Sequence, residues 1–322
     1  MKVALDVSPL RLTRAGSARY VEGLRRHLPA HVELGELAWG GSGRATAFVR
    51  DAVWYPLGLP RAARGADLLH APTFRAPLRS SVPLVVTVLD LAVLRHPELF
   101  NRWNATYSRL TVPRVVRAAR RLIAISEFTK AELVELLGVK PSRVEVIGVP
   151  APEGLSPEGA RADGEYVLAV GTLEPRKNLA RAAEAAARAG AELRVVGARG
   201  WGDVEANGVR WLGEVDDAEL ARLLRGARAL VYPSLYEGFG IPILEAMSVG
   251  TPVVTSRGGA TEEVAGGAAV LVDPLDPASI AAGLEEADRR RDELRALGLA
   301  RAGEFTWDDV ARRTVDVYRA AL

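Results

Sequence analysis

The sequence contains no cysteine among its 322 residues. Disulfides, thiolate metal sites and thiol nucleophiles are therefore excluded. It also has no uninterrupted apolar run of the ~18–20 residues that a membrane-spanning helix needs. The first apolar stretch, over residues 1–7, is short and contains Asp6, so it predicts a strand rather than a signal peptide. We therefore expect a cytoplasmic protein.

Two common phosphate-binding signatures are missing as well. No segment has the spacing G-x-x-x-x-G-K-[ST], and the glycine-rich segments 40–43 and 197–202 do not follow G-x-G-x-x-G. Such loops bind phosphate groups in P-loop NTPases and in dinucleotide-dependent dehydrogenases. The sequence therefore argues against both classes.

Lysine is scarce, whereas arginine is abundant. Only four of the 42 basic residues are lysines, and one of them is Lys177. Residues 1–160 carry 22 basic against 14 acidic residues, and residues 161–322 carry 20 against 26. The positive first part either attracts an anionic partner or is simply solvated surface.

The overall composition is that of a folded protein with about two domains. Apolar residues make up 48% and charged residues 25% of the chain, which excludes a disordered or fibrous protein. Strand-like apolar runs alternate with helical patterns from end to end, so the sequence predicts an α/β fold with mostly parallel sheets. A linker rich in proline and glycine, over 150–159, separates two such series.

Two loops that join a strand end to a helix start look suited to an anion. The first spans 10–19 and contains Gly16, whose lack of a side chain lets backbone N–H groups approach a phosphate. The second spans 171–178, where Arg176 and Lys177 offer a forked and a compact cation that suit a diphosphate. The alternative interpretations are an ordinary strand–helix turn for the first and a solvated helix start for the second.

A third loop, over 233–245, combines a turn with two carboxylates. Gly238 and Gly240 predict a tight turn, and the N-terminus of the helix that follows favours an anion. Glu237 and Glu245 can accept hydrogen bonds from sugar hydroxyls. The combination suits a sugar joined to a phosphate. The alternative interpretation of Glu245 is helix capping.

These segments resemble the retaining family-4 glycosyltransferases of the GT-B fold, particularly bacterial mannosyltransferase-like members. Residues 171–178 match the family's G-T-x-E-P-R-K-N, and residues 237–245 match its E-x7-E motif within P-S-x-x-E-G-F-G-x-P-x-L-E-A-M. Segments 250–254, 263–266 and 271–274 follow in the family's order. The resemblance is nearly continuous over the second half of the chain and looser over the first half.

The resemblance implies two Rossmann-like domains whose parallel sheets face an interdomain cleft. The acceptor-side domain is expected at 1–155 and the nucleotide-sugar donor domain at 156–305. A C-terminal helix over 306–322 is expected to be able to cross back to the first domain.

The resemblance also implies roles for individual residues. Arg176 and Lys177 would neutralise the diphosphate and Glu237 would hold hydroxyls of the donor sugar, so these three are the expected catalytic residues. Glu245 would hold the ribose. The expected residues for binding donor and nucleotide are Gly16, Thr172, Arg176, Lys177, Glu237, Gly238, Phe239, Gly240 and Glu245. No metal and no cofactor is expected, because the two cations take the place of a divalent ion.

One position departs from the family's pattern. The family usually has a histidine followed by an aspartate at the end of the strand that corresponds to 83–89. This sequence has Leu89 followed by Asp90. Asp90 and His70 are the candidate acceptor-side residues. The departure keeps open a nucleotide-sugar-binding protein that no longer transfers.

The expected activity is a retaining, metal-independent transfer of a hexose from a nucleotide-sugar to a glycan or lipid-linked acceptor. Mannose from GDP-mannose is the preferred donor. The alternatives are a binding protein of this fold without transfer and a nucleotide-sugar epimerase. Nucleic acid is not an expected partner.

Arginines cluster at two places in the first half of the chain. Four are expected along one helix over 113–121, and the others lie near Gly16: Arg14, Arg19, Arg25 and Arg26. They either attract anionic lipids, with peripheral contact at the inner face of the membrane, or form a solvated helix face.

Overall fold

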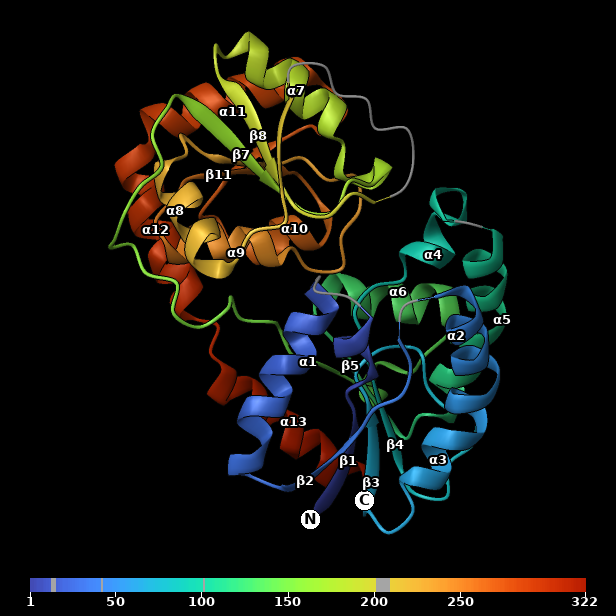
Figure 1. The fold of residues 1–322 in the computed structure, drawn as a ribbon. Helices are drawn as coiled ribbons and strands as arrows, with labels where there is room; N and C mark the ends of the chain where they lie inside the picture. Colours follow the sequence, from blue (N-terminus) through green and yellow to red (C-terminus); the bar gives the residue numbers. More distant parts are fainter. Residues whose placement is uncertain (13–15, 42, 101, 201–208) are drawn as a thin grey trace. The chain divides into compact units, whose positions relative to one another are not determined.

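The computed structural model describes residues 1–12, 16–41, 43–100, 102–200 and 209–322. Contacts divide the chain into two compact units, drawn in Figure 1. The first unit contains Met1–Val149 together with Thr306–Leu322, and the second contains Pro150–Phe305. Arg14 belongs to a segment outside the described residues. Among the described residues, no helix combines the length and the apolar character needed to span a bilayer.

The first unit contains a six-stranded parallel sheet in the order β2-β1-β3-β4-β5-β6. Its strands are β1 (Lys2–Asp6), β2 (Glu33–Leu37), β3 (Leu68–Ala71), β4 (Leu84–Val88), β5 (Arg121–Ala124) and β6 (Val144–Val146). Strands β3 and β4 are buried along their whole length, as apolar runs in parallel sheets usually are.

The helices of the first unit connect these strands and cover the sheet. They are α1 (Gly16–His27), α2 (Arg44–Val49), the π-helix η3 (Arg50–Gly58), α3 (Leu59–Ala62), α4 (Ala92–Arg95), α5 (Arg102–Ala118), α6 (Glu127–Leu137) and α13 (Trp307–Ala321). Short 3-10 helices are η1 (Ser8–Arg11), η2 (Leu28–Ala30), η4 (Pro97–Leu99) and η5 (Pro141–Arg143). The helix expected over 113–121 ends at Ala118, so Arg120 and Arg121 are not on it.

The second unit repeats the architecture with a sheet in the order β12-β11-β10-β7-β8-β9. All neighbouring strands are parallel. The strands are β7 (Tyr166–Val170), β8 (Glu192–Val196), β9 (Val209–Gly213), β10 (Leu230–Tyr232), β11 (Val253–Ser256) and β12 (Val270–Val272). The first strand, β7, lies between β8 and β10, so the direction in which the chain adds strands reverses there.

The helices of the second unit lie on both faces of its sheet (Figure 1). They are η6 (Pro175–Lys177), α7 (Leu179–Arg188), α8 (Asp217–Gly226), α9 (Ile241–Ser248), α10 (Gly259–Ala265), α11 (Pro277–Arg289) and α12 (Arg291–Gly303). Helix α7 buries Leu179, Ala182 and Ala186, a spacing that places one apolar stripe against the core. Helix α11 packs beside α7 and on β11 and β12.

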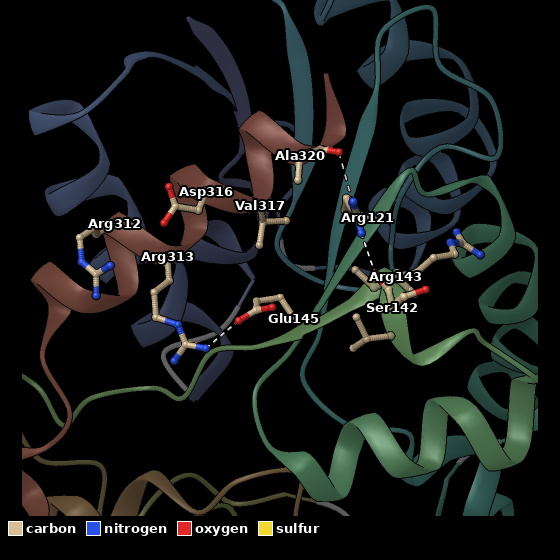
Figure 2. Close-up of a pocket in the computed structure, with 11 residues that line it drawn as sticks. Arg121, Ser142, Arg143, Glu145, Arg312, Arg313, Asp316, Val317 and Ala320 are labelled. Atoms are coloured by element: carbon tan, nitrogen blue, oxygen red, sulfur yellow. Dashed lines mark hydrogen bonds and ion pairs between the residues drawn. The ribbon is translucent and has the colours of Figure 1, made fainter.

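Helix α13 belongs to the first unit although it follows the whole second unit in sequence. It packs on β4 and β5 and beside α1. Arg313 Nη2 donates hydrogen bonds to Glu145 Oε1 at 2.7 Å and to the Val146 carbonyl oxygen at 2.6 Å, as Figure 2 shows in part. Arg121 Nε donates to the Ala320 carbonyl oxygen at 3.2 Å. These bonds tie the helix to the β5–β6 edge of the sheet.

Gly23 lets α1 and α13 approach each other closely. A Cβ atom at this position would lie 2.0 Å from Cη2 of Trp307. The indole ring of Trp307 also stacks on the His27 ring, with 5.8 Å between the ring centroids. Trp307 is 8% exposed. The absence of a side chain at position 23 is therefore required by the docking of α13.

We expect Gly23→Ala to destabilise the protein by up to about 2 kcal/mol. Overpacking a filled core costs about 1–3 kcal/mol, and the higher helix propensity of alanine offsets about 1 kcal/mol of that cost. The matched control is Gly303→Ala, since no atom lies within 4 Å of a Cβ built there. Thermal unfolding of both variants tests the idea, and equal stability of the two variants would contradict it.

Candidate functional site

Two loops of the second unit meet at the point where the strand order reverses. Residues Gly171–Asn178 follow β7, and residues 233–240 follow β10, which is the neighbour of β7 in the sheet. In doubly wound sheets, ligands bind outside the carboxyl ends of the strands at such a reversal. Thr172, in the first of these loops, is partly exposed.

Glu237 is the centre of an ion cluster that joins the two loops. Its Oε1 accepts a hydrogen bond from Lys177 Nζ at 2.6 Å, and its Oε2 accepts one from Arg176 Nη1 at 2.7 Å. Arg176 Nε donates to Glu174 Oε2 at 2.6 Å. Lys177 Nζ also donates to the Tyr232 hydroxyl at 2.7 Å. Two cations and two carboxylates thus share one small site.

The cluster is largely withdrawn from water, which controls its protonation. The side chains of Glu237, Lys177 and Arg176 are 9%, 10% and 19% exposed. Burial by itself would raise the pKa of Glu237, but the charges of Lys177 and Arg176 outweigh it and lower the pKa to about 2. Burial lowers the pKa of Lys177, and Glu237 opposes that shift. Glu237 is therefore an anion at neutral pH and acts as an acceptor of hydrogen bonds.

Backbone geometry holds the two loops in register. The Leu235 N–H donates to the Arg176 carbonyl oxygen at 2.8 Å. Asn178 is the one non-glycine residue with positive φ, 58°, among the residues described. Its Nδ2 donates to the carbonyl oxygens of Pro233, at 3.0 Å, and Pro274, at 2.6 Å. Asparagine tolerates the left-handed conformation better than most residues.

The loop after β8 contacts the loop after β7 closely. A Cβ atom at Gly197 would lie 2.2 Å from the carbonyl oxygen of Gly171, a contact that no side chain allows. Gly197 has a φ of 145°, which also favours glycine. Only glycine at this position lets the backbones after β7 and β8 come so close together.

The turn before α9 has the expected form. Gly240 adopts a φ of 113° and immediately precedes α9, which begins at Ile241. The ring of Phe239 is buried and meets the Phe305 ring edge-on, with 5.8 Å between centroids. Gly238 is also buried. Glu245, expected to hold a ribose, lies inside α9 and is only 2% exposed.

The candidate residues of the first unit have different surroundings. Gly16 is exposed and begins α1. Asp90 follows β4 and is partly exposed, and its Oδ1 accepts a hydrogen bond from the Ala92 N–H at 3.1 Å. Leu89, which stands where the family usually has histidine, is also partly exposed.

His70 does not fit the acceptor-side role expected for it. It is fully buried, with Nδ1 2.7 Å from the Tyr318 hydroxyl and Nε2 2.9 Å from Thr87 Oγ1. Burial lowers the pKa of His70 to about 3, so the ring is neutral. Because both ring nitrogens are occupied inside the core, His70 is a structural residue that links β3, β4 and α13.

Sequence reasoning assigned no role to three members of this site. Glu174 and Asn178 are part of the motif over 171–178, and their conformational and ion-pairing roles become visible only when the loop is folded. Tyr232 ends β10, and nothing in its sequence context separates it from an ordinary core tyrosine. Among the described residues, no group of three or more histidine, aspartate or glutamate side chains is arranged to hold a metal ion.

Two known family models match this chain. Residues 15–149 match "Glycosyltransferase Family 4", and residues 164–287 match "Glycosyl transferases group 1". The chain belongs to these glycosyltransferases. The second match contains the whole Arg176–Lys177–Glu237 cluster.

Several curated relatives are similar over most of this chain. The O-antigen chain mannosyltransferase B of Escherichia coli is 30% identical over 282 residues, which cover 78% of this chain and 74% of that protein. A D-inositol 3-phosphate glycosyltransferase of Nocardioides sp. is 34% identical and is covered over 63% of its length, against 76% of this chain. The MMP alpha-(1->4)-mannosyltransferase of Mycolicibacterium hassiacum is 34% identical, over 80% of this chain and 69% of that protein.

Solved structures identify the fold as GT-B. Sucrose-phosphate synthase from Thermosynechococcus elongatus superposes with a TM-score of 0.80 at 19% identity, covering 99% of this chain and 98% of that one. WaaG, a glycosyltransferase of lipopolysaccharide biosynthesis, gives 0.76 at 17% identity, covering 98% and 99%. Anabaena HepE in complex with UDP-glucose gives 0.75 at 18% identity, covering 99% and 100%.

We expect Glu237→Gln to lower the stability of this glycosyltransferase by about 3 kcal/mol, because it leaves two buried cations without their shared counter-ion. The wild-type contribution is fully present above the ordinary glutamate pKa of 4.5 and is lost as the pH falls towards 2. The stability difference should therefore be largest near neutral pH and shrink in acid. Urea unfolding at pH 7 and pH 3 measures it.

The matched control is Glu184→Gln, which removes an exposed partner of Arg188. We expect a change within about 0.5 kcal/mol for this variant. A Glu237→Gln variant as stable as the control at pH 7 would show that the cluster does not hold the two loops together.

Proposed function

We propose that this glycosyltransferase moves a hexose from a nucleotide-sugar to a glycan or lipid-linked acceptor, with retention and without a metal. The preferred donor is GDP-mannose, from which mannose is transferred. The observation that supports the proposal best is the cluster of Arg176 and Lys177 around Glu237, at the reversal of strand order in the second sheet.

Arg176 and Lys177 are suited to a diphosphate leaving group. When the bond between sugar and phosphate breaks, negative charge grows on the phosphate oxygens. Fixed donors in a site withdrawn from water stabilise that charge strongly, and they need no reorganisation as the reaction proceeds. Both side chains are already held in place by Glu237, Glu174 and Tyr232. They can therefore supply the charge that a divalent cation supplies in other enzymes.

In the proposed reaction, Glu237 exchanges its hydrogen-bond partners when the donor binds. Without a donor, both of its oxygens accept from the two cations. When the cations turn to a diphosphate, those oxygens become available to hydroxyl groups of the donor sugar. In this scheme Glu245 binds the ribose. Thr172, Gly238, Phe239 and Gly240 border the donor.

Retention does not require Glu237 to act as a nucleophile. A carboxylate whose two oxygens are engaged by Lys177 and Arg176 is a weak nucleophile, unlike the free carboxylate of a double-displacement hydrolase. We favour departure and attack on the same face of the sugar, with the leaving phosphate accepting the acceptor's proton. Asp90, partly exposed after β4, is the acceptor-side candidate that remains.

The choice of donor rests on the relatives. Two of the three curated relatives described above are named mannosyltransferases. The HepE structures contain UDP, glucose or UDP-glucose, so a UDP-linked hexose is the second candidate donor. Because the chain spans 58–74% of the length of the curated relatives, their acceptors are not transferred to it.

Thermal unfolding with GDP, UDP, ADP and their sugar conjugates, in EDTA, tests the donor site. A nucleotide at a hundredfold excess over its Kd should stabilise the protein by about 2.7 kcal/mol. Lys177→Ala should weaken binding by about ten- to a hundredfold, as the loss of one charge-assisted hydrogen bond does. Lys130→Ala, which removes a lysine that pairs with Glu127 in the first unit, is the control. No shift with any nucleotide would refute the site.

Product analysis separates the three candidate activities. Transfer predicts nucleotide release that depends on an acceptor. A binding protein, which Leu89 keeps as an alternative, would bind the donor without such release. An epimerase would change the sugar without any acceptor.

We also propose weak peripheral contact with anionic membranes at the inner face, through the exposed Arg114, Arg117 and Arg120. Leu110, 53% exposed on the same helix as Arg114, adds an apolar contact. Arg25 contributes less, because it is paired with Glu22 and Glu36.

Sedimentation with anionic vesicles at low salt should carry the protein down. Arg114→Gln/Arg117→Gln should reduce the sedimented fraction severalfold, since each basic residue contributes about 1 kcal/mol near such a surface. Neutral vesicles are the control, and absence of binding to anionic vesicles would contradict the membrane contact.

A further inference from the structure

A second basic site lies in the second unit, at the opposite ends of the strands from the Glu237 cluster. It is a cavity of about 270 Å³ whose polar lining residues are Arg161, Arg225, Thr251, Arg291, Asp292 and Arg295. Ala227, which also lines it, comes just before β10, and Thr251 comes just before β11. The cavity is therefore at the amino ends of these strands, whereas the Glu237 cluster follows the carboxyl end of β10.

The charges in this cavity are unbalanced. Four arginines face one carboxylate, and within the described part of the chain Asp292 forms no ion pair with any of them. The part of the chain that contains the cavity is otherwise acidic, with 20 basic against 26 acidic residues over 161–322. An excess of positive charge collected in one hollow of an acidic surface favours an anion.

Backbone carbonyl groups orient two of the arginines without neutralising them. Arg225 donates to the carbonyl oxygens of Ala160, at 2.8 Å, and Ser156, at 2.9 Å. Arg291 Nη2 donates to the Arg228 carbonyl oxygen at 2.7 Å and forms an ion pair with Asp288 at 3.4 Å, a carboxylate that also pairs with Arg228. The charge of Arg225 is thus left for a ligand, and that of Arg291 is partly offset by Asp288.

The other two arginines keep nearly all their donors unused. Arg161 is exposed and forms no hydrogen bond or ion pair with any described residue. Arg295 makes a single contact, 3.5 Å from Nη1 to the Gly250 carbonyl oxygen. A Cβ atom at Gly250 would lie 2.6 Å from Arg295 Nη1. Gly250, with a φ of 76°, thus leaves the space that the guanidinium occupies.

The larger cavity of the first unit shows the contrast. It measures about 380 Å³ and is also lined by arginines (Figure 2). There Arg313 is paired with Glu145, and Arg312 is paired with Asp309. Both pairs balance arginine charge with a carboxylate, and Arg313 also ties α13 to the sheet. In the smaller cavity Arg161, Arg225 and Arg295 have no carboxylate partner among the described residues.

We propose that the cavity around Arg161, Arg225, Arg291 and Arg295 binds the phosphate groups of a small phosphorylated molecule. Guanidinium groups bind phosphate oxygens in pairs of parallel hydrogen bonds, so a few arginines satisfy one or two phosphates. The site is separate from the donor site, because the ~10 Å length of β10 lies between the two loops. It does not depend on the identity of the donor or on transfer activity.

Calorimetric titration with inorganic pyrophosphate tests the proposal, with a hexose 6-phosphate as a second probe that reports whether a sugar is recognised as well. Arg161→Gln/Arg295→Gln should lose one equivalent of pyrophosphate relative to wild type, whether or not the donor site also binds one. The control is Arg188→Gln/Arg222→Gln, which removes the same charge from arginines paired with Glu184 and Glu219. The control should bind as wild type does.

The single variant Arg161→Gln provides a second measurement if the double variant is unstable. Arg161 has no partner to lose, so folding should be unchanged while affinity falls about tenfold or more, the effect of one charge-assisted hydrogen bond. An unchanged number of bound pyrophosphates in the variants would overturn the proposal. An equal loss in the control pair would do so too, because it would indicate general charge attraction.

Discussion

The ion cluster at Glu237 is the interaction on which the candidate site of the second unit depends. One carboxylate holds an adjacent arginine and lysine of a loop about 60 residues away in sequence, so charges from two loops become one nearly buried group. Such a group is costly to bury unless every charge is paired. The same pairing fixes the positions of both cations. Stability of the two loops and the placement of their charges therefore have a common cause.

Sheet topology decides where this chemistry can occur. Strand β7 lies between β8 and β10, so the loops after β7 and β10 meet at the reversal of strand order. Gly171 and Gly197 allow the neighbouring backbones to touch, and Asn178 fixes the turn into α7. The amino ends of β10 and β11 carry a different set of arginines, two of which donate to backbone carbonyls. The second unit thus presents cations at both ends of the strands of one sheet, closely paired with carboxylates at one end and mostly unpaired at the other.

The first unit depends on a helix that comes from the other end of the chain. Helix α13 supplies Trp307 to the groove at Gly23 and Tyr318 to the buried ring of His70. His70 lies within β3, and it was an acceptor-side candidate because Leu89 stands where the family usually has histidine. Because its partners Thr87 and Tyr318 lie 17 and 248 residues away, its burial could not be predicted from its neighbours in sequence.

The sequence by itself determined the α/β architecture and the position of the two loops that form the candidate site. Apolar runs of strand length, helical periodicity and the motifs around Arg176 and Glu237 are local signals, and they survive without knowledge of the fold. Only the tertiary structure decided which charges meet. It paired Lys177 with Glu237, withdrew His70 and Glu245 from solvent, ended α5 before Arg121, and gathered Arg161 and Arg295 into one cavity. The physical reason is that pairing and burial depend on distances between residues remote in sequence, which strand order and helix docking set.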